Sequence, residues 1–209
     1  MKKFFVMILL CLLFSNSLFA ASDNSQVTLP QRTWSVLFYT GQMTKNTLGQ
    51  VFGFGGKFNG EELYSLELGH ELAPTNPVRE FLQPLVGTVE VVLNGTYERD
   101  FSGPIYELNP MLMLRWQHFP WNKYLLTTLG FGEGVSYASS IPTREQSDSS
   151  TVSSRRLLNF LAFEATFGLP NYSSWELVAR IHHRSGAFGL YDAGNSGSTA
   201  MAVGIRYLF

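Results

Sequence analysis

Alternation of apolar and polar residues limits the fold of this chain more than any other feature, and residues 175–186 show it best. Trp175, Leu177 and Ala179 fall on one face of an extended strand and Ile181 continues it, because successive side chains of a strand point to opposite faces. The opposite face is mostly charged, with Glu176, Val178, Arg180, His182 and Arg184. An apolar face backed by a charged face suits a barrel wall between lipid and a polar lumen.

Seven more segments alternate in the same way, separated by stretches rich in turn residues. They are residues 34–40, 62–70, 85–94, 106–117, 125–137, 161–167 and 201–209. The connections between them alternate long and short, apart from 73–84, as in barrels with long external loops and short periplasmic turns. The segments 41–60, 139–154 and 186–197 are the expected external loops, and 95–103 is a further connection.

Aromatic residues support a membrane location for these strands. Five of them fall near the predicted periplasmic strand ends, as an interfacial girdle requires: Trp116, Trp121, Trp175, Tyr207 and Phe209. The final strand ends on an aromatic residue, which is typical of bacterial outer-membrane barrels. The sequence therefore predicts an all-β protein, an eight-stranded antiparallel transmembrane β-barrel of the outer-membrane type, with residues 21–209 as its single domain. The alternative is a secreted lipocalin-like barrel with its apolar faces turned inward around a ligand.

Two positions depart from the simple alternation. Pro110 lies inside a predicted strand and cannot donate to the ladder, so we expect a bulge there. Glu133 falls on the apolar face of residues 125–137, which indicates either a bulge in that strand or a position at the level of the lipid headgroups. The opposite face of the same strand carries Gly130, Gly132 and Gly134, small residues that suit a crowded barrel interior.

The N-terminus has the form of a secretory signal peptide, assigned to residues 1–20. Lys2 and Lys3 precede an apolar run over residues 4–14, and residues 18–21 form the expected cleavage region. An uncleaved anchor is disfavoured, because a span needs about 20 apolar residues. The single cysteine, Cys11, lies in this segment, so the mature chain has no disulfide and no cysteine metal site.

Charge excludes several classes of function. Charged residues make up 15% of the chain and the formal net charge is -1, which argues against a nucleic-acid partner. Eight strands leave little or no channel, so a diffusion pore is disfavoured. The charged residues of the inner faces are expected to pair with one another: Glu67, Glu90, Glu107, Arg115, Glu164, Glu176, Arg180 and Arg206. No metal motif is recognised, and no cofactor is expected.

His183 and Ser185 continue the apolar face of residues 175–186. In this strand they would lie outside the barrel near the external membrane interface, with Cα atoms about 6.5 Å apart. A serine hydroxyl needs a base to become a nucleophile, and a histidine two residues away can supply it. The simpler interpretation is a polar rim where the strand leaves the bilayer.

The order His183-Arg184-Ser185 near the start of the last hairpin resembles the His-x-Ser motif of the PagL-type lipid A 3-O-deacylases. The wider stretch 180–209, together with Leu157-Leu158-Asn159, is similar to bacterial proteins commonly labelled acyloxyacyl hydrolase-like. The resemblance implies an outer-membrane enzyme that acts on lipid A or lipopolysaccharide, with Ser185 as nucleophile and His183 as base on the lipid-facing wall.

Two positions depart from the family pattern. The family carries a glutamate early in the final strand, where residues 196–199 here hold no carboxylate, and an asparagine after the nucleophile, where this chain has Gly186. Asp192 is the candidate substitute acid. The backbone N–H groups of Gly186 and Ala187 are the candidate oxyanion donors, and Arg155 is the candidate contact to a lipid phosphate.

Three functions remain open on the sequence. The leading hypothesis is a serine esterase that removes an ester-linked acyl chain from lipopolysaccharide. The alternative is a non-catalytic barrel of the same family with a structural or lipid-binding role, and a small-ligand transporter or adhesin comes third. Which acyl chain is removed and whether the protein forms oligomers are both undetermined.

Overall fold

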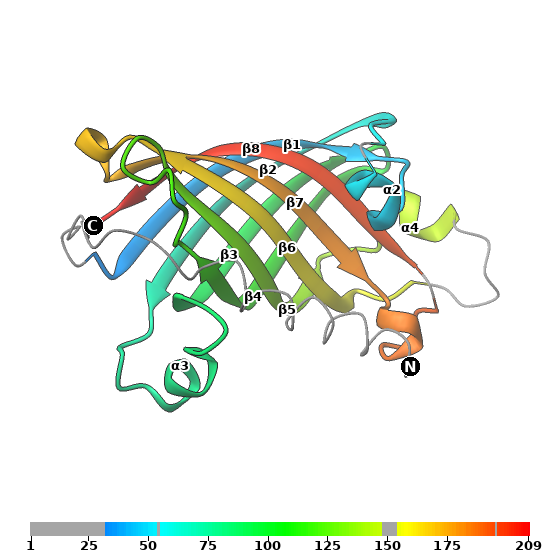
Figure 1. Ribbon diagram of the computed structural model, residues 1–209. Coiled ribbons are helices and arrows are strands. Elements are labelled where there is room, and N and C mark those ends of the chain that lie inside the picture. Colours follow the sequence, from blue (N-terminus) through cyan, green and yellow to red (C-terminus); the bar gives the residue numbers. More distant parts are fainter. Residues whose placement is uncertain (1–31, 54, 148–153, 195) are drawn as a thin grey trace. The chain divides into compact units, whose positions relative to one another are not determined.

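The computed structural model describes residues 32–53, 55–147, 154–194 and 196–209. The predicted signal peptide, residues 1–20, lies outside this part of the chain, as do residues 148–153 of the predicted loop 139–154. Eight antiparallel strands form a closed barrel in which each strand pairs with its neighbours in sequence and β8 pairs with β1 (Figure 1). This confirms the predicted eight-stranded barrel.

Most strands are longer than the alternation predicted, whereas β5 and β7 lie within one residue of their predicted bounds. They are β1 (Trp34–Thr44), β2 (Phe58–Glu71), β3 (Thr88–Asp100), β4 (Gly103–Trp116), β5 (Leu126–Ala138), β6 (Leu157–Gly168), β7 (Trp175–Ser185) and β8 (Gly197–Leu208). Short helices occupy the connections: α2 (Leu48–Phe52), α3 (Pro77–Leu82), α4 (Thr143–Ser147), η1 (Pro170–Tyr172) and η2 (Ala187–Gly189). Figure 1 shows α2, α4 and the turn after β7 at one end of the barrel, with α3 and the C-terminus at the other.

None of the helices in the described residues is long and apolar enough to cross a membrane.

The prediction of a connection over residues 95–103 is wrong. β3 continues to Asp100 and pairs with β4 as far as Gly103, so only Phe101 and Ser102 join the two strands. The alternation persists to the end of β3, with Tyr97 exposed and Glu98 fully buried. Glu98 and Asp100 face the lumen, where Arg144 binds Glu98 and Thr143 donates a hydrogen bond to Asp100.

The predicted bulge at Pro110 is also wrong. Its pairing with Leu93 continues the unshifted register of β3 and β4. On the other side, the pairs Leu108–Tyr137 and Met111–Gly134 keep the same offset while stepping over Asn109 and Pro110. A Cβ on Gly134 would overlap the Pro110 carbonyl oxygen, so glycine allows β5 to follow β4 closely where proline supplies no N–H.

Glu133 stays in register on the outward face of β5. The β5–β6 pairing is continuous through the pair Glu133–Leu161, and the outward neighbours Leu129, Val135 and Tyr137 are exposed as Glu133 is. Of the two interpretations left open by the sequence, a bulge is excluded. A carboxylate therefore lies on the apolar outer wall.

The barrel interior is filled by ion pairs, as predicted. Glu164 binds Arg115, Arg180 and Arg206 together. Around this centre, Glu67 pairs with Arg180, Glu90 with Arg115 and Glu176 with Arg206. Glu107 forms a separate cluster with His182 and Arg184. Burial of these charges is tolerated because each has an opposite partner.

Helix α4 extends the polar interior at the end of the barrel where β7 finishes. Arg144 pairs with Glu61 and Glu98, while Glu145 accepts hydrogen bonds from Ser154 and Ser198. Helix α4 is therefore bonded to polar residues of the lumen, and the contact with Ser198 ties it to the second residue of β8.

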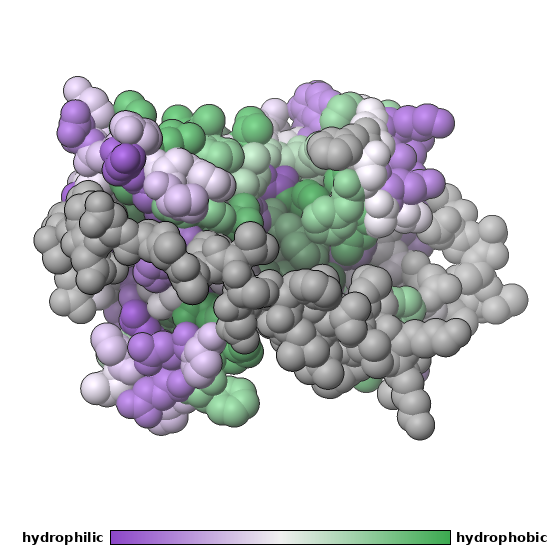
Figure 2. Space-filling view, in the orientation of Figure 1, coloured by the Kyte–Doolittle hydropathy of each residue, from purple (hydrophilic) through white to green (hydrophobic). Residues whose placement is uncertain are grey.

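The outer surface is apolar around the middle of the barrel. Figure 2 shows hydrophobic residues over the middle of the visible wall and hydrophilic residues at both of its ends. Aromatic side chains gather where β7 starts and β8 ends: Trp175 and Tyr207 have ring centroids 4.7 Å apart, and Phe209 stacks on Tyr207 at 5.9 Å. The predicted aromatic girdle at this end is thus present.

Candidate active site on the outer wall

β7 places His183 and Ser185 on the outer wall of the barrel. Their neighbours His182 and Arg184 point inward and are fully buried, whereas His183 and Ser185 are partly exposed on the opposite face. Both lie at the end of the strand that Figure 1 shows beside α2 and α4. The two side chains are alternate residues of one straight strand, so they share a face, as the sequence predicted.

His183 is held by a threonine of the neighbouring strand. Its Nδ1 lies 2.9 Å from the Thr199 hydroxyl oxygen, and the two residues are direct partners in the β7–β8 pairing. Thr199 is 3% exposed, so this contact is shielded from solvent. With Nδ1 at the Thr199 hydroxyl, Nε2 is the other ring nitrogen at which a neutral imidazole can accept a proton. The sequence analysis missed Thr199, because only the pairing of β7 with β8 identifies it.

The backbone after Ser185 adopts an unfavourable conformation. The Ala187 N–H donates to Ser185 Oγ at 3.1 Å, and Ala187 and Phe188 have φ values of 46° and 56°. Left-handed conformations cost about 1–2 kcal/mol for residues with a side chain. Strained backbone of this kind persists where surrounding contacts maintain it, and it is often found at functional sites.

Gly186 is required by close packing rather than by its own φ of −68°. A Cβ at this position would lie 2.7 Å from the Gly194 carbonyl oxygen. Its N–H donates to the Ser196 carbonyl at 2.8 Å and so closes the loop. Of the two backbone donors that the sequence suggested, Ala187 faces Ser185 and Gly186 is engaged in the loop.

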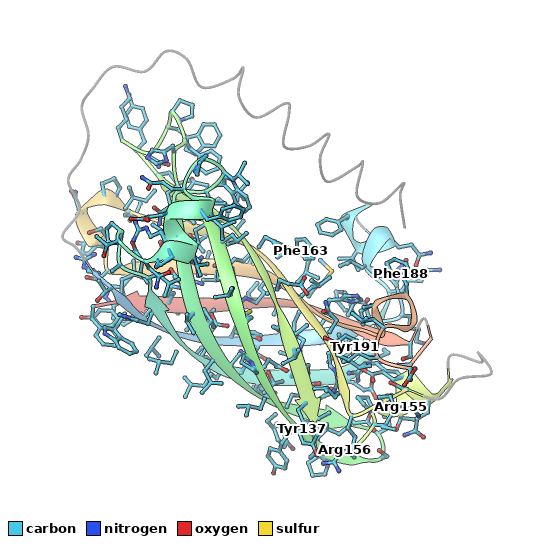
Figure 3. All side chains as sticks on the ribbon, turned by 90° about the horizontal axis from the view of Figure 1, so that it is seen from below. Tyr137, Arg155, Arg156, Phe163, Phe188 and Tyr191 are labelled. Atoms are coloured by element: carbon cyan, nitrogen blue, oxygen red, sulfur yellow. The ribbon has the colours of Figure 1, made fainter. Side chains whose placement is uncertain are left out.

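Asp192, the candidate substitute acid, lies exposed in the same loop with a φ of 53°. The recorded side-chain partner of His183 is Thr199, so the structure does not bring Asp192 to the imidazole. Arg155 is exposed just before β6, and its carbonyl accepts a hydrogen bond from Arg184 at 3.5 Å. Figure 3 shows Arg155 at the same end of the barrel as Tyr191 of the loop after β7.

An apolar groove of about 970 Å³ runs along the outer wall below the His183–Ser185 pair. Ile181, two residues before His183 on the same face, lines it, and the small paired residues Ala165 and Ala179 lie further along. Phe52 of α2 covers part of the wall, and its ring packs edge to face with that of Phe163, with centroids 4.9 Å apart. The groove is therefore an apolar hollow on the outer wall, and Ile181 is the residue of its lining that lies closest in sequence to His183.

Within the described residues, one group of acidic side chains has the spacing of a metal site: Glu61, Glu98 and Asp100. It lies inside the barrel and not beside Ser185. The guanidinium of Arg144 is within 4.0 Å of all three carboxylates. Since the protein supplies this cation itself, the cluster is explained as an ion-pair network.

No family model matches this sequence, and no curated protein matches it. Among solved structures, the outer membrane enzyme PagL aligns with a TM-score of 0.57 at 14% identity, covering 84% of this chain and 99% of PagL. The barrel domain of Pseudomonas aeruginosa OprF and Neisserial surface protein A each align with a TM-score of 0.45, at 12% and 10% identity. These alignments cover 86% and 84% of this chain, and 98% and 96% of the respective structures. The protein has the fold of an eight-stranded outer-membrane barrel.

Proposed function

We propose that this protein is an outer-membrane esterase that removes an ester-linked acyl chain from the lipid A part of lipopolysaccharide. The observation that carries the proposal is the position of His183 and Ser185 on the apolar outer wall, with Thr199 fixing the imidazole. A base and a hydroxyl gain nothing for barrel stability on a surface that faces lipid. They are suitably placed to meet an ester whose acyl chain lies in the membrane.

The proposed reaction follows from the chemistry of a serine and a histidine on one face of β7. Ser185 Oγ attacks the ester carbonyl carbon while His183 Nε2 takes its proton. The negative oxygen of the tetrahedral intermediate is stabilised by the Ala187 N–H, which already points at Ser185 Oγ. The ester C–O bond then breaks and His183 returns the proton to the departing alcohol oxygen. A water, activated by His183, hydrolyses the acyl-serine and releases a fatty acid.

The surroundings of the pair match an amphipathic substrate. The groove beneath it is lined mainly by apolar residues and has a volume at the upper end of ligand sites, so it accommodates an acyl chain lying along the barrel. Above the pair, Arg155 supplies a guanidinium at the polar end of the wall. A phosphate of lipid A is the group that such a cation would bind.

The test uses purified protein in detergent with lipid A as substrate, followed by mass spectrometry of the lipid and of released fatty acid. Wild type is expected to remove an acyl chain, and Ser185→Ala and His183→Ala are each expected to abolish the release. Ser174→Ala and His118→Ala, at the opposite end of the barrel, are matched controls that should retain full activity. If wild type and Ser185→Ala are equally inactive, the esterase proposal fails.

A non-catalytic, lipid-binding barrel is the second candidate, and one observation favours it. The partner of His183 is a neutral hydroxyl rather than a carboxylate, so the imidazolium formed during the reaction lacks a nearby negative charge. In that case lipid A should bind to wild type and to Ser185→Ala with equal affinity and remain intact.

A further inference from the structure

Two more polar residues, Glu133 and Asn159, lie on the outer wall beside the reactive pair. Asn159 of β6 is the direct pairing partner of Ser185 of β7. Glu133 of β5 pairs with Leu161, the residue two positions after Asn159 on the same face of β6. The pairing register therefore places Asn159 directly beside Ser185 and Glu133 diagonally across from Asn159 on the other side of β6.

The two side chains interact with each other on an otherwise apolar surface. Glu133 is exposed among apolar outward neighbours of β5, and its carboxylate lies close enough to the Asn159 side chain for the amide to interact with it. Acids inside this barrel pair with arginines, as Glu67 does with Arg180. Glu133 instead has a neutral amide as its partner on a face where charge is unfavourable. Barrel stability does not account for this arrangement.

The backbone near Ser185 offers the oxyanion a single hydrogen-bond donor. The Gly186 N–H donates to the Ser196 carbonyl, so the Ala187 N–H is the backbone donor that faces Ser185. Stabilisation of a tetrahedral intermediate relies on several donors aimed at the position that the oxyanion will occupy. Directly paired residues of neighbouring strands have Cβ atoms about 4.5–5.5 Å apart, which brings an Asn159 amide within reach of an acyl group on Ser185.

We propose that Asn159 is a catalytic residue whose amide donates the second hydrogen bond to the oxyanion formed on Ser185, and that Glu133 is the positioning residue that holds this amide. The inference rests on the proposed esterase function. An amide nitrogen carries two hydrogens: one is bound by Glu133, which fixes the orientation of the group, and the other points along the wall toward Ser185.

Glu133 does not fit the alternative role of third member of the triad. Along the pairing, Leu161 separates Glu133 from His183, so two strand spacings, about 10 Å, lie between their backbones. The Nδ1 atom that such an acid would bind is already held by Thr199. Glu133 therefore acts on the side of the site where the substrate oxygen develops charge, and not on the base.

The test measures kcat and KM for acyl release by Asn159→Ala, Asn159→Asp and Glu133→Gln. Loss of one oxyanion donor lowers kcat about 10²–10³-fold, and we expect this for both Asn159 variants with KM unchanged. Glu133→Gln should lower kcat less, because the amide stays but is no longer held by a charge. The double variant Asn159→Ala with Glu133→Gln should be no slower than Asn159→Ala alone.

Asn171→Ala and Glu80→Gln, at the other end of the barrel, are matched controls expected to keep wild-type kcat. Resistance of every variant to SDS at room temperature checks that the barrel has assembled. Wild-type kcat in Asn159→Ala overturns the oxyanion role while leaving the esterase function intact. Additive losses in the double variant overturn the link between Glu133 and Asn159. Absence of hydrolysis by wild type overturns the inference together with the function on which it rests.

Discussion

The two faces of β7 hold the same kinds of residue in opposite surroundings. On the inner face, Arg180 pairs with Glu67 and Glu164, and His182 lies between Tyr39 and Glu107. On the outer face, His183 has one neutral hydroxyl partner and Ser185 accepts one backbone N–H. Each of these inner side chains has partners on more than one strand. The outer side chains have partners only on the neighbouring strand or in the adjoining loop.

The inner polar residues are present because they stabilise the barrel. The presence of the outer polar residues is not explained by barrel stability. A charge in a closed lumen is unfavourable unless an opposite charge meets it, so the inner network is self-sufficient and needs no ligand. A polar group on the lipid-facing wall can simply be replaced by an apolar one. Those that are present at the outer end of β7, β6 and β5 are therefore the residues on which the proposed esterase function depends.

The role of the outer face of β7 depends on which leaflet of the membrane His183 and Ser185 face. Cysteine labelling on whole cells distinguishes the two orientations. Leu190, 78% exposed after β7, and Tyr172, 67% exposed before it, lie at opposite ends of that strand. With no other cysteine in residues 21–209, Leu190→Cys should react with an impermeant reagent on whole cells. Tyr172→Cys should react only after permeabilisation. The reverse result would put Ser185 beside the inner leaflet.

Substitutions by leucine should have opposite effects on the two faces. Arg180→Leu leaves Glu67 and part of Glu164 without a buried counter-charge and should lower the free energy of unfolding by about 3–5 kcal/mol. Glu133→Leu, on the outer wall, should leave it unchanged or raise it by about 1 kcal/mol while reducing acyl release. Urea unfolding in detergent micelles measures both, and equal destabilisation would remove the distinction between the faces.

Substitutions at Thr199 measure how much the proposed activity of His183 depends on the neutral hydroxyl beside it. Thr199→Val should lower kcat about tenfold, the equivalent of one neutral hydrogen bond of roughly 1.4 kcal/mol, whereas Thr199→Ser should restore it. Thr199→Asp places a carboxylate against Nδ1 of His183 and should raise kcat above wild type. Acyl release from lipid A reports all three, and an inactive Thr199→Ser would show that packing, not the hydroxyl, is what matters.

The smallest effect is expected at Asp192. Because the residue is exposed and His183 is already bound by Thr199, Asp192→Asn should change kcat less than twofold, a difference of about 0.4 kcal/mol or less. The measurement is the same acyl-release assay, with Asp192→Asn combined with Thr199→Val as the sharper variant. A large loss in the single variant would establish Asp192 as the acid that the sequence suggested.

Local periodicity was sufficient for much of the architecture. Because a strand turns alternate residues to opposite faces, the sequence alone assigned Arg180 to the lumen and His183 and Ser185 to the outer wall. The inner acids and arginines were assigned to a paired network for the same reason, and the paired residues are those now seen around Glu164 and Glu107. Errors arose where polar residues continued a strand, as at Glu98, or where proline suggested an irregularity, as at Pro110.

The neighbours across the strands were decided only by the tertiary structure. Alternation gives the face of each residue but carries no information on how far one strand slides along the next, which depends on turns, loop packing and barrel closure. That register sets Thr199 opposite His183 and Asn159 opposite Ser185. It also brings Glu133 to Asn159, although 26 positions separate them in the chain. The period-two pattern thus predicted that His183 and Ser185 lie on the outer wall. Only the register of the closed barrel identifies the residues that surround them.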